Sequence, residues 1–310
     1  MTPAPLVSLE NVGVRFATRG GVLHALDGVR LDIREGETLG LVGESGSGKS
    51  TLGSVVAGLQ PPSEGRMRFE GRPLDRAARR AIQIVFQDPF GALDPRMPVS
   101  AIVGEPLRIQ KLGTRAERQA RVAALVRQVG LPADALNRYP HEFSGGQRQR
   151  IAIARALAPA PRLIVADEPL SALDVSIQSQ VLNLLREMQA RRGLAYLFIS
   201  HDMAVVNHIA DRVAVLYLGR IVEFAPRSAL FAQPAHPYTT ALLAAVPRIG
   251  VRRRPDGALR GEMPSALAPP AGCHFHPRCP KAQPRCRAER PPLTPLPTQP
   301  EHAAACHFPG

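Results

Sequence analysis

The sequence predicts an α/β protein, in which a mostly parallel sheet is covered by helices on both faces. Three apolar segments of strand length, TLGLV at 38–42, LIVAD at 163–167 and AYLFIS at 195–200, are separated by segments with helical periodicity. Alternation of strands and helices is typical of such a layered fold. After about Phe224 prolines accumulate and the periodicity fades. This change predicts a small C-terminal extension that needs a cross-link to hold its shape.

The remaining elements can be placed in chain order. Residues 7–42 alternate short apolar stretches with the turn signals TRGG and REGE, and this pattern predicts a small β-region that leads into TLGLV. A helix-compatible run, STLGSVVAGL, follows the glycine-rich loop at 43–48 and should end near Pro61. From Pro89 to about Arg155 the chain should be mostly helical, and a helical period is visible in RAERQARVAALVRQVG.

Composition limits the class of protein. No apolar run in the 310 residues reaches the roughly 20 needed to span a bilayer, and the first ten residues lack the regions of a secretory signal. We therefore expect a cytoplasmic protein, in which a structural disulfide is disfavoured. The net charge of +13 would attract nucleotides, nucleic acid or membrane headgroups, but the arginines are scattered, so charge alone selects none of them.

The segment GESGSGKS at 43–50 fits G-x-x-x-x-G-K-S between a predicted strand and a predicted helix. Its glycines let the backbone N–H groups point at phosphate oxygens, and the helix dipole adds positive potential. Lys49 should bridge the β- and γ-phosphates, and Ser50 should ligate Mg²⁺. The segment predicts a nucleoside-triphosphate site made of Gly43, Glu44, Ser45, Gly46, Ser47, Gly48, Lys49, Ser50 and Thr51.

The segment RLIVADEP at 162–169 supplies two carboxylates at the end of a buried strand. Asp167 can hold Mg²⁺ through water, and Glu168 can polarise the attacking water as a general base.

The segment FSGGQRQRIAIARAL at 143–157 is the most specific part of the sequence. Ser144 suits a helix N-cap, and the glycine pair allows a backbone to approach a ligand closely. With GESGSGKS, FQDP, LIVADEP, SALD and His201 in this order, residues 6–225 resemble ATP-binding cassette ATPases. The resemblance implies a RecA-like core sheet, an N-terminal antiparallel β subdomain and a helical signature subdomain at about 89–155. It places the nucleotide-binding domain at 1–225 and the extension at 226–310.

The resemblance also implies roles for individual residues. Ser144, Gly145, Gly146 and Gln147 match the signature sequence, which caps the ATP held by a partner subunit in a head-to-tail dimer. Four single residues match other family positions. Gln87 would touch Mg²⁺ and report to the membrane subunits, and Asp174 would link the two ATP sites. His201 would contact the γ-phosphate, and Phe16 would stack on the adenine in place of the usual tyrosine.

The tail resembles one branch of this family. AHPYTTALLAAVP at 235–247 and GEMPSALAPPAGCHFHPRCP at 261–280 are similar to the ATPase subunits of dipeptide, oligopeptide and nickel permeases. This implies import of short peptides, or alternatively of nickel or another solute, at the cytoplasmic face of the inner membrane. The implied partners are a second ATPase subunit (a paralogue or a second copy), two membrane-spanning permease subunits and an extracytoplasmic solute-binding protein. A soluble ATPase acting on nucleic acid is the rival, but no second cassette or coiled coil accompanies the first.

All four cysteines lie in the tail, with the spacing C-x₅-C-x₆-C-x₁₉-C. Four thiolates suit Zn²⁺ or a [4Fe–4S] cluster, and His274, His276, His302 and His307 could replace a cysteine on zinc. Unligated thiols, or a disulfide formed on isolation, are a further alternative. Similar tails in peptide-permease ATPases are associated with an iron–sulfur cluster, so the resemblance favours a cluster on Cys273, Cys279, Cys286 and Cys306.

Overall fold

The computed structural model describes residues 4–171, 173–246 and 261–310. Ala172 of SALD and Pro247 of AHPYTTALLAAVP lie outside these ranges. The chain divides into two compact units: unit 1 comprises Met1–Ile33, Thr38–Pro73 and Phe198–Gly310, and unit 2 comprises Arg34–Glu37 and Leu74–Leu197. No helix in the described ranges is long and apolar enough to cross a bilayer.

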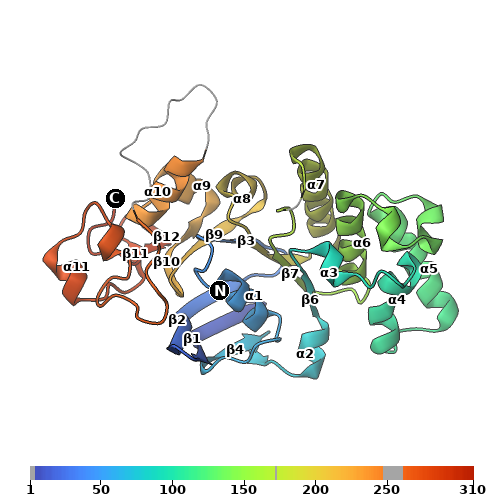
Figure 1. Ribbon diagram of the computed structural model, residues 1–310, viewed down its shortest axis with the longest axis horizontal. Coiled ribbons are helices and arrows are strands. Elements are labelled where there is room, and N and C mark those ends of the chain that lie inside the picture. Colours follow the sequence, from blue (N-terminus) through green and yellow to red (C-terminus); the bar gives the residue numbers. More distant parts are fainter. Residues whose placement is uncertain (1–3, 172, 247–260) are drawn as a thin grey trace. The chain divides into compact units, whose positions relative to one another are not determined.

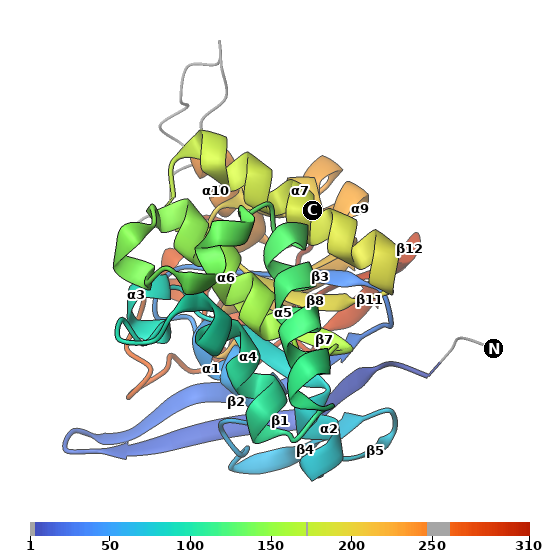
Figure 2. The same ribbon diagram turned by 90° about the vertical axis from the view of Figure 1, so that its right-hand side faces the viewer.

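Unit 1 contains the predicted N-terminal β-region as an antiparallel sheet. Its strands are β1 (Val7–Thr18), β2 (Gly21–Ile33), β4 (Glu64–Phe69) and β5 (Arg72–Pro73), in the order β2-β1-β4-β5. β1 and β2 form the long hairpin visible in Figure 2, which turns at the predicted TRGG signal, where Thr18 Oγ1 donates to Gly21 O at 2.8 Å.

A second group of strands in unit 1 follows the order β11-β12-β10-β9-β3 (Figure 1). β3 (Thr38–Val42) runs parallel to β9 (Arg212–Tyr217), and every residue of both strands is buried. Burial on both faces explains why these strands are nearly continuous apolar runs. β10 (Arg220–Pro226) is antiparallel to β9.

The C-terminal extension joins this sheet. β12 (Gln299–Ala304) pairs with β10, and β11 (Thr294–Leu296) pairs with β12. The sequence did not predict these strands, because the proline-rich run PPLTPLPTQP reads as irregular; proline is compatible with a strand only at an edge or an end. The helices of unit 1 are α1 (Lys49–Val56), α8 (Met203–Ile209), α9 (Arg227–Ala232), α10 (Pro237–Ala245) and α11 (Pro284–Ala288).

Unit 2 is mostly helical between residues 89 and 157, as predicted. Its strands β6 (Ile82–Val85) and β7 (Leu163–Asp167) are parallel, and β8 (Ala195–Ile199) runs from unit 2 into unit 1. Figure 2 shows α4, α5 and α6 packed side by side. The helices of unit 2 are α2 (Arg76–Arg80), α3 (Pro89–Ala92), α4 (Val99–Ile109), α5 (Arg115–Gln128), α6 (Gly145–Leu157) and α7 (Val175–Arg192), with 3₁₀ turns at Ala133–Asn137 and Pro140–Glu142.

Candidate functional site

The phosphate loop of unit 1 lies between β3 and α1 and depends on glycine at two positions. Gly43 has a φ of 155° and Gly48 a φ of 105°, a region that favours glycine. A Cβ atom on Gly43 would lie 2.2 Å from the carbonyl oxygen of Leu216, and one on Gly48 would lie 2.5 Å from that of Ala25. The loop can therefore keep this path only without side chains at Gly43 and Gly48.

Lys49 begins α1 and is 5% exposed. Its Nζ donates to the carbonyl oxygens of Gly43 at 2.8 Å and Glu44 at 2.9 Å, so the ammonium group is held against the loop itself. The Ser47 hydroxyl is buried and has no hydrogen-bond partner among the described residues. Ser50 and Thr51 occupy the first turn of α1, at the positive end of the helix dipole.

Unit 1 also contains Phe16 and His201. Phe16 is half-buried on β1 and is paired with Leu23 of β2. His201 is exposed and follows the end of β8, directly before Asp202, whose carboxylate caps α8 by accepting from the N–H of Ala204 at 2.8 Å. The loop, the aromatic ring and the histidine thus belong to one unit.

Unit 2 brings Gln87 and Glu168 together. β6 and β7 are parallel with Val85 opposite Ala166, so both segments leave the sheet at the same edge. Gln87 Nε2 donates to Glu168 Oε2 at 3.2 Å, and Asp167 is the last residue of β7. The carboxyl edge of parallel strands is where ligands commonly bind in α/β folds.

Glu168 has a backbone conformation that its sequence did not predict. Its φ is +46°, in the left-handed region that costs a non-glycine residue about 1–3 kcal/mol. Ser171 stabilises this conformation, because its backbone N–H and its Oγ both donate to Glu168 O, at 3.3 and 3.1 Å. Such strain at a carboxylate is typical of functional sites.

The signature residues form the N-terminal end of α6 in unit 2, with Ser144 as its N-cap. Ser144 Oγ accepts from Gln147 N at 3.4 Å and Gln147 Oε1 accepts from Ser144 N at 3.0 Å, which completes a capping box. Gly146 is buried against α7, and a Cβ there would lie 2.3 Å from Ile177 Cγ2. Helices α6 and α7 therefore approach closely at their N-terminal ends.

Asp174 caps the neighbouring helix. Its Oδ1 accepts from Ile177 N at 3.0 Å and from Ser176 Oγ at 2.7 Å, and the Ile177 N–H is the main cause that lowers the pKa of this carboxyl. Leu173 lies 3.6 Å from the position of a Cβ on Gly145. The structure thus places the predicted signature and the predicted linking loop side by side.

The four cysteines of unit 1 converge. All four are free thiols that line one small cavity of about 10 Å³, together with His276 and His307. Burial raises the pKa of Cys273 to about 11 and also raises those of Cys279 and Cys306. Within the described residues no group of three or more His, Cys, Asp or Glu side chains has the arrangement of a metal-ion site. The four thiols therefore line one cavity, but in the described residues they are not arranged as in a site with a bound iron–sulfur cluster or zinc.

Two of the four histidines weighed as zinc ligands have other partners. His302 Nε2 lies 2.6 Å from Oε1 of the buried Glu223, and His274 Nε2 lies 3.3 Å from Arg290 Nη2. Neither of them lines the cysteine cavity, whereas His276 and His307 do.

Comparisons with known proteins identify the family. The family model described as ABC transporter matches residues 26–171, and the model described as oligopeptide/dipeptide transporter, C-terminal region, matches residues 222–286. Putative peptide import ATP-binding proteins of Brucella ovis and Brucella abortus are 52% identical to the chain over 314 residues, which covers 99% of this chain and 98% of theirs. The chain belongs to the ABC transporter family.

Other proteins similar to this ABC ATPase belong to the same family. A probable peptide ABC transporter ATP-binding protein of Sinorhizobium fredii is 52% identical, with 94% of this chain and 84% of that protein covered. Among solved structures, the dimeric cassette MJ0796 bound to ADP and phosphate has a TM-score of 0.65 at 32% identity, covering 71% of this chain and 98% of that one. CbiO1 of Clostridium perfringens, part of a cbiONQ transporter complex, has a TM-score of 0.66 at 31% identity, covering 74% and 91%.

The matched regions cover most of the predicted motifs. Residues 26–171 include the phosphate loop, the signature, Asp167 and Glu168, so the nucleotide-binding fold and ATPase activity predicted from the sequence are confirmed. Residues 222–286 include three of the four cysteines.

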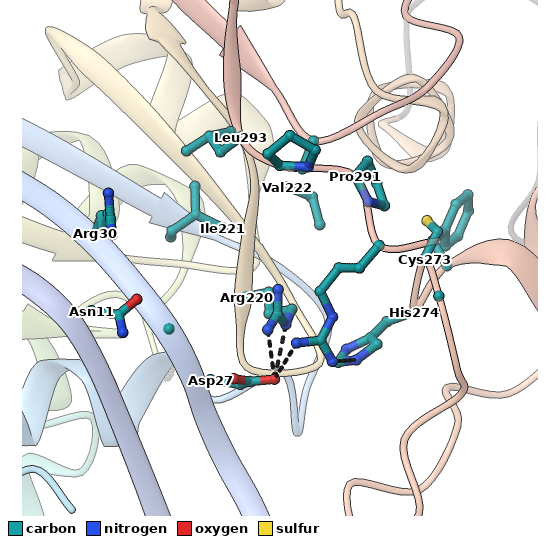
Figure 3. A pocket seen from close by; sticks show the side chains of 16 residues that line it. Asn11, Asp27, Arg30, Arg220, Ile221, Val222, Cys273, His274, Pro291 and Leu293 are labelled. Carbon is teal, nitrogen blue, oxygen red and sulfur yellow. Dashed lines mark hydrogen bonds and ion pairs between the residues drawn. The ribbon is translucent and has the colours of Figure 1, made fainter. Parts of the chain in front are cut away.

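A further cavity of the ABC ATPase, of about 540 Å³, lies in unit 1 between β2, β10 and the extension (Figure 3). Arg220 Nη2 donates to Asp27 Oδ2 at 2.7 Å, and Arg290 Nη1 lies 3.3 Å from the same oxygen. Figure 3 shows Arg220 directed at Asp27. On the side of the extension, Arg290 Nη2 also lies 3.3 Å from His274 Nε2. This ion-pair network anchors the extension to β2.

Proposed function

We propose that this ABC ATPase powers the import of di- and oligopeptides through a membrane transporter. The supporting observation is the similarity to peptide-import ATP-binding proteins, which covers 99% of the chain and includes its C-terminal region. Import of nickel or another small solute is the alternative, since the sequence of the tail also resembles nickel permeases.

We assign the steps of hydrolysis by motif. Phe16 stacks on the adenine, Lys49 binds the β- and γ-phosphates, and Ser50, Gln87 and Asp167 hold Mg²⁺. Glu168 polarises the attacking water as general base, and His201 contacts the γ-phosphate.

The signature residues Ser144–Gln147 act on the ATP of a partner subunit, which is a paralogue or a second copy of this chain. Two observations support this: Ser144, the first signature residue, is exposed at the N-terminal end of a helix, and the similar MJ0796 cassette is dimeric. Asp174 lies in the loop that would connect the two ATP sites.

A groove of about 250 Å³ in unit 2 suits the membrane subunits. It is lined by Phe86 and Ile109, which are 45% and 70% exposed, and Phe86 directly precedes Gln87. Exposed apolar side chains around a groove are typical of an interaction surface. We assign it to a cytoplasmic segment of a permease subunit, which places the ATPase at the inner face of the membrane.

The four cysteines are proposed to hold a [4Fe–4S] cluster, with one Zn²⁺ as the alternative. The support is the convergence of four thiols on one cavity in a proline-rich segment with little apolar core. A bound metal group would cross-link this segment and so stabilise its fold.

Uptake assays test the proposed function. A strain that lacks this gene should lose uptake of labelled di- and tripeptides, and the wild-type gene should restore it while the Glu168→Gln variant should not. Loss of nickel uptake with normal peptide uptake would replace the proposal by its alternative. Normal uptake of both would refute it.

A further inference from the structure

The extension contacts the phosphate loop directly, through Glu44. This residue is the first variable position of GESGSGKS, and its carboxylate forms a two-bond ion pair with Arg278. Arg278 Nη1 donates to Glu44 Oε2 at 2.7 Å and Nη2 donates to Oε1 at 3.0 Å. Paired bonds of this geometry are among the strongest that side chains form.

A second contact holds the backbone of the same residue. The N–H of Glu44 donates to the hydroxyl oxygen of Tyr238 at 2.8 Å, so both the backbone and the side chain of Glu44 are fixed from residues beyond β10. The carbonyl oxygen of Glu44 in turn accepts from Lys49 Nζ. One residue therefore connects the extension to the lysine of the loop.

The two tethering side chains are rigidly supported. The Arg278 side chain is 4% exposed, and Tyr238 is fully buried. The Tyr238 ring packs against Tyr217 and Phe275, with ring centroids 4.7 and 5.4 Å away. Because close packing restricts their rotamers, the two polar ends are held at fixed positions.

We infer that Arg278 and Tyr238 are positioning residues of the phosphate loop, through which the C-terminal extension sets nucleotide affinity. Pairing with Arg278 also neutralises a carboxylate in a loop that must accept a triphosphate. Without this cation, the charge of Glu44 would oppose nucleotide binding.

A binding assay on the purified full-length chain tests this inference, with the fluorescent nucleotide mant-ATP and Mg²⁺ as the probe. Arg278→Ala should raise the Kd about tenfold, a loss typical of a charge-assisted pair. Arg278→Lys keeps the positive charge but cannot form the two parallel hydrogen bonds of the guanidinium group. Its affinity for mant-ATP should therefore lie between those of Arg278→Ala and wild type. Tyr238→Phe should raise the Kd by a smaller factor, because only one neutral hydrogen bond is lost.

A double variant separates positioning from general destabilisation. If Arg278 acts through Glu44, the Glu44→Ala/Arg278→Ala variant should bind mant-ATP no more weakly than Arg278→Ala alone. Purely additive effects would contradict the inference.

Arg290→Ala is the matched control, because it removes an ion pair from the same extension at a point that does not contact the loop. It should leave the Kd within about twofold of wild type. An equal loss of affinity in Arg290→Ala and Arg278→Ala, or an unchanged Kd in well-folded Arg278→Ala and Arg278→Lys, would overturn the inference.

Discussion

Gln87 Nε2 donates a hydrogen bond to Glu168 Oε2, at 3.2 Å, where β6 and β7 end. The amide is neutral, so it orients the carboxylate without supplying an opposite charge. The strained backbone of Glu168 further fixes the direction of this side chain. Both features suit a carboxylate that must stay aligned with a water molecule.

Replacing Glu168 by glutamine should preserve ATP binding and lower the hydrolysis rate at least about 100-fold, since the amide cannot accept a proton. Single-turnover hydrolysis and mant-ATP binding measure the two effects. Glu187→Gln is the control, because Glu187 is exposed on α7, where it pairs with Arg191. Wild-type hydrolysis by Glu168→Gln would show that another group is the base.

Gly146→Ala should destabilise unit 2, because the added methyl group would meet Ile177 Cγ2 at 2.3 Å. We expect a loss of about 1–3 kcal/mol, as for other overpacked sites. Thermal unfolding of Gly146→Ala and Gly145→Ala gives the comparison, since a Cβ on Gly145 has its nearest contact at 3.6 Å. Equal melting temperatures for the two variants would contradict the close helix approach.

Ile109→Asp should uncouple transport from ATP binding. A charge in the apolar groove would oppose docking of a permease segment, so peptide uptake should fall at least about tenfold while nucleotide Kd stays unchanged. Val22→Asp, at an exposed apolar position of the β1–β2 hairpin, is the control. Normal uptake by Ile109→Asp would remove the groove from the coupling proposal.

The ionisation of Asp27 should make the free energy of unfolding depend on pH in the acid range. Burial alone would raise its pKa, but the hydrogen bond and charge of Arg220, with Arg290, outweigh burial and lower the pKa of the folded state. Because the pKa of Asp27 is lower in the folded state than in the unfolded state, its ionisation stabilises the fold at pH values above the pKa of the unfolded state. This stabilisation is lost as the pH falls through the pKa of the folded state.

The Asp27→Asn variant should therefore be less stable than wild type at pH about 7, by about 1–3 kcal/mol. The difference should shrink as the pH falls below about 4. Urea unfolding across this pH range measures both values. Asp134→Asn, at an exposed ion pair, should show little difference at either end. A constant difference at every pH would contradict the assigned pKa shift.

Metal analysis of anaerobically purified protein tests the cysteine proposal. About four irons and four sulfides per chain, lost in Cys279→Ser, are expected for a [4Fe–4S] cluster with four cysteine ligands. About one zinc would establish the alternative. Absence of metal from well-folded protein would show that the four thiols are unligated.

Sequence patterns predicted the elements whose physical signals are local. TLGLV and LIVAD are buried on both faces and therefore read as continuous apolar strands, and both were found as β3 and β7. Ser144 and Gln147 form the kind of N-cap that sequence spacing can show. The order of the ATP motifs along the chain also indicated the family, because each motif is a short continuous segment.

Contacts between distant segments could not be predicted in this way. Arg278 lies 234 positions after Glu44, and nothing in HPRC marks the arginine as a partner of the phosphate loop. The positive φ of Glu168 likewise depends on the bonds that Ser171 supplies. β11 and β12 were missed because proline-rich segments carry no strand periodicity.

The pairing of β12 with β10 has a consequence for the behaviour of truncated chains. A cassette that ended after β10 would expose the backbone N–H and C=O groups of that strand, a ready template for pairing with another molecule. The proline residues on β11 and β12 are poor partners for further strand addition. β11 and β12 thus protect the edge of the sheet from pairing between molecules. Deletion of these strands should therefore lower the solubility of the protein before it affects catalysis.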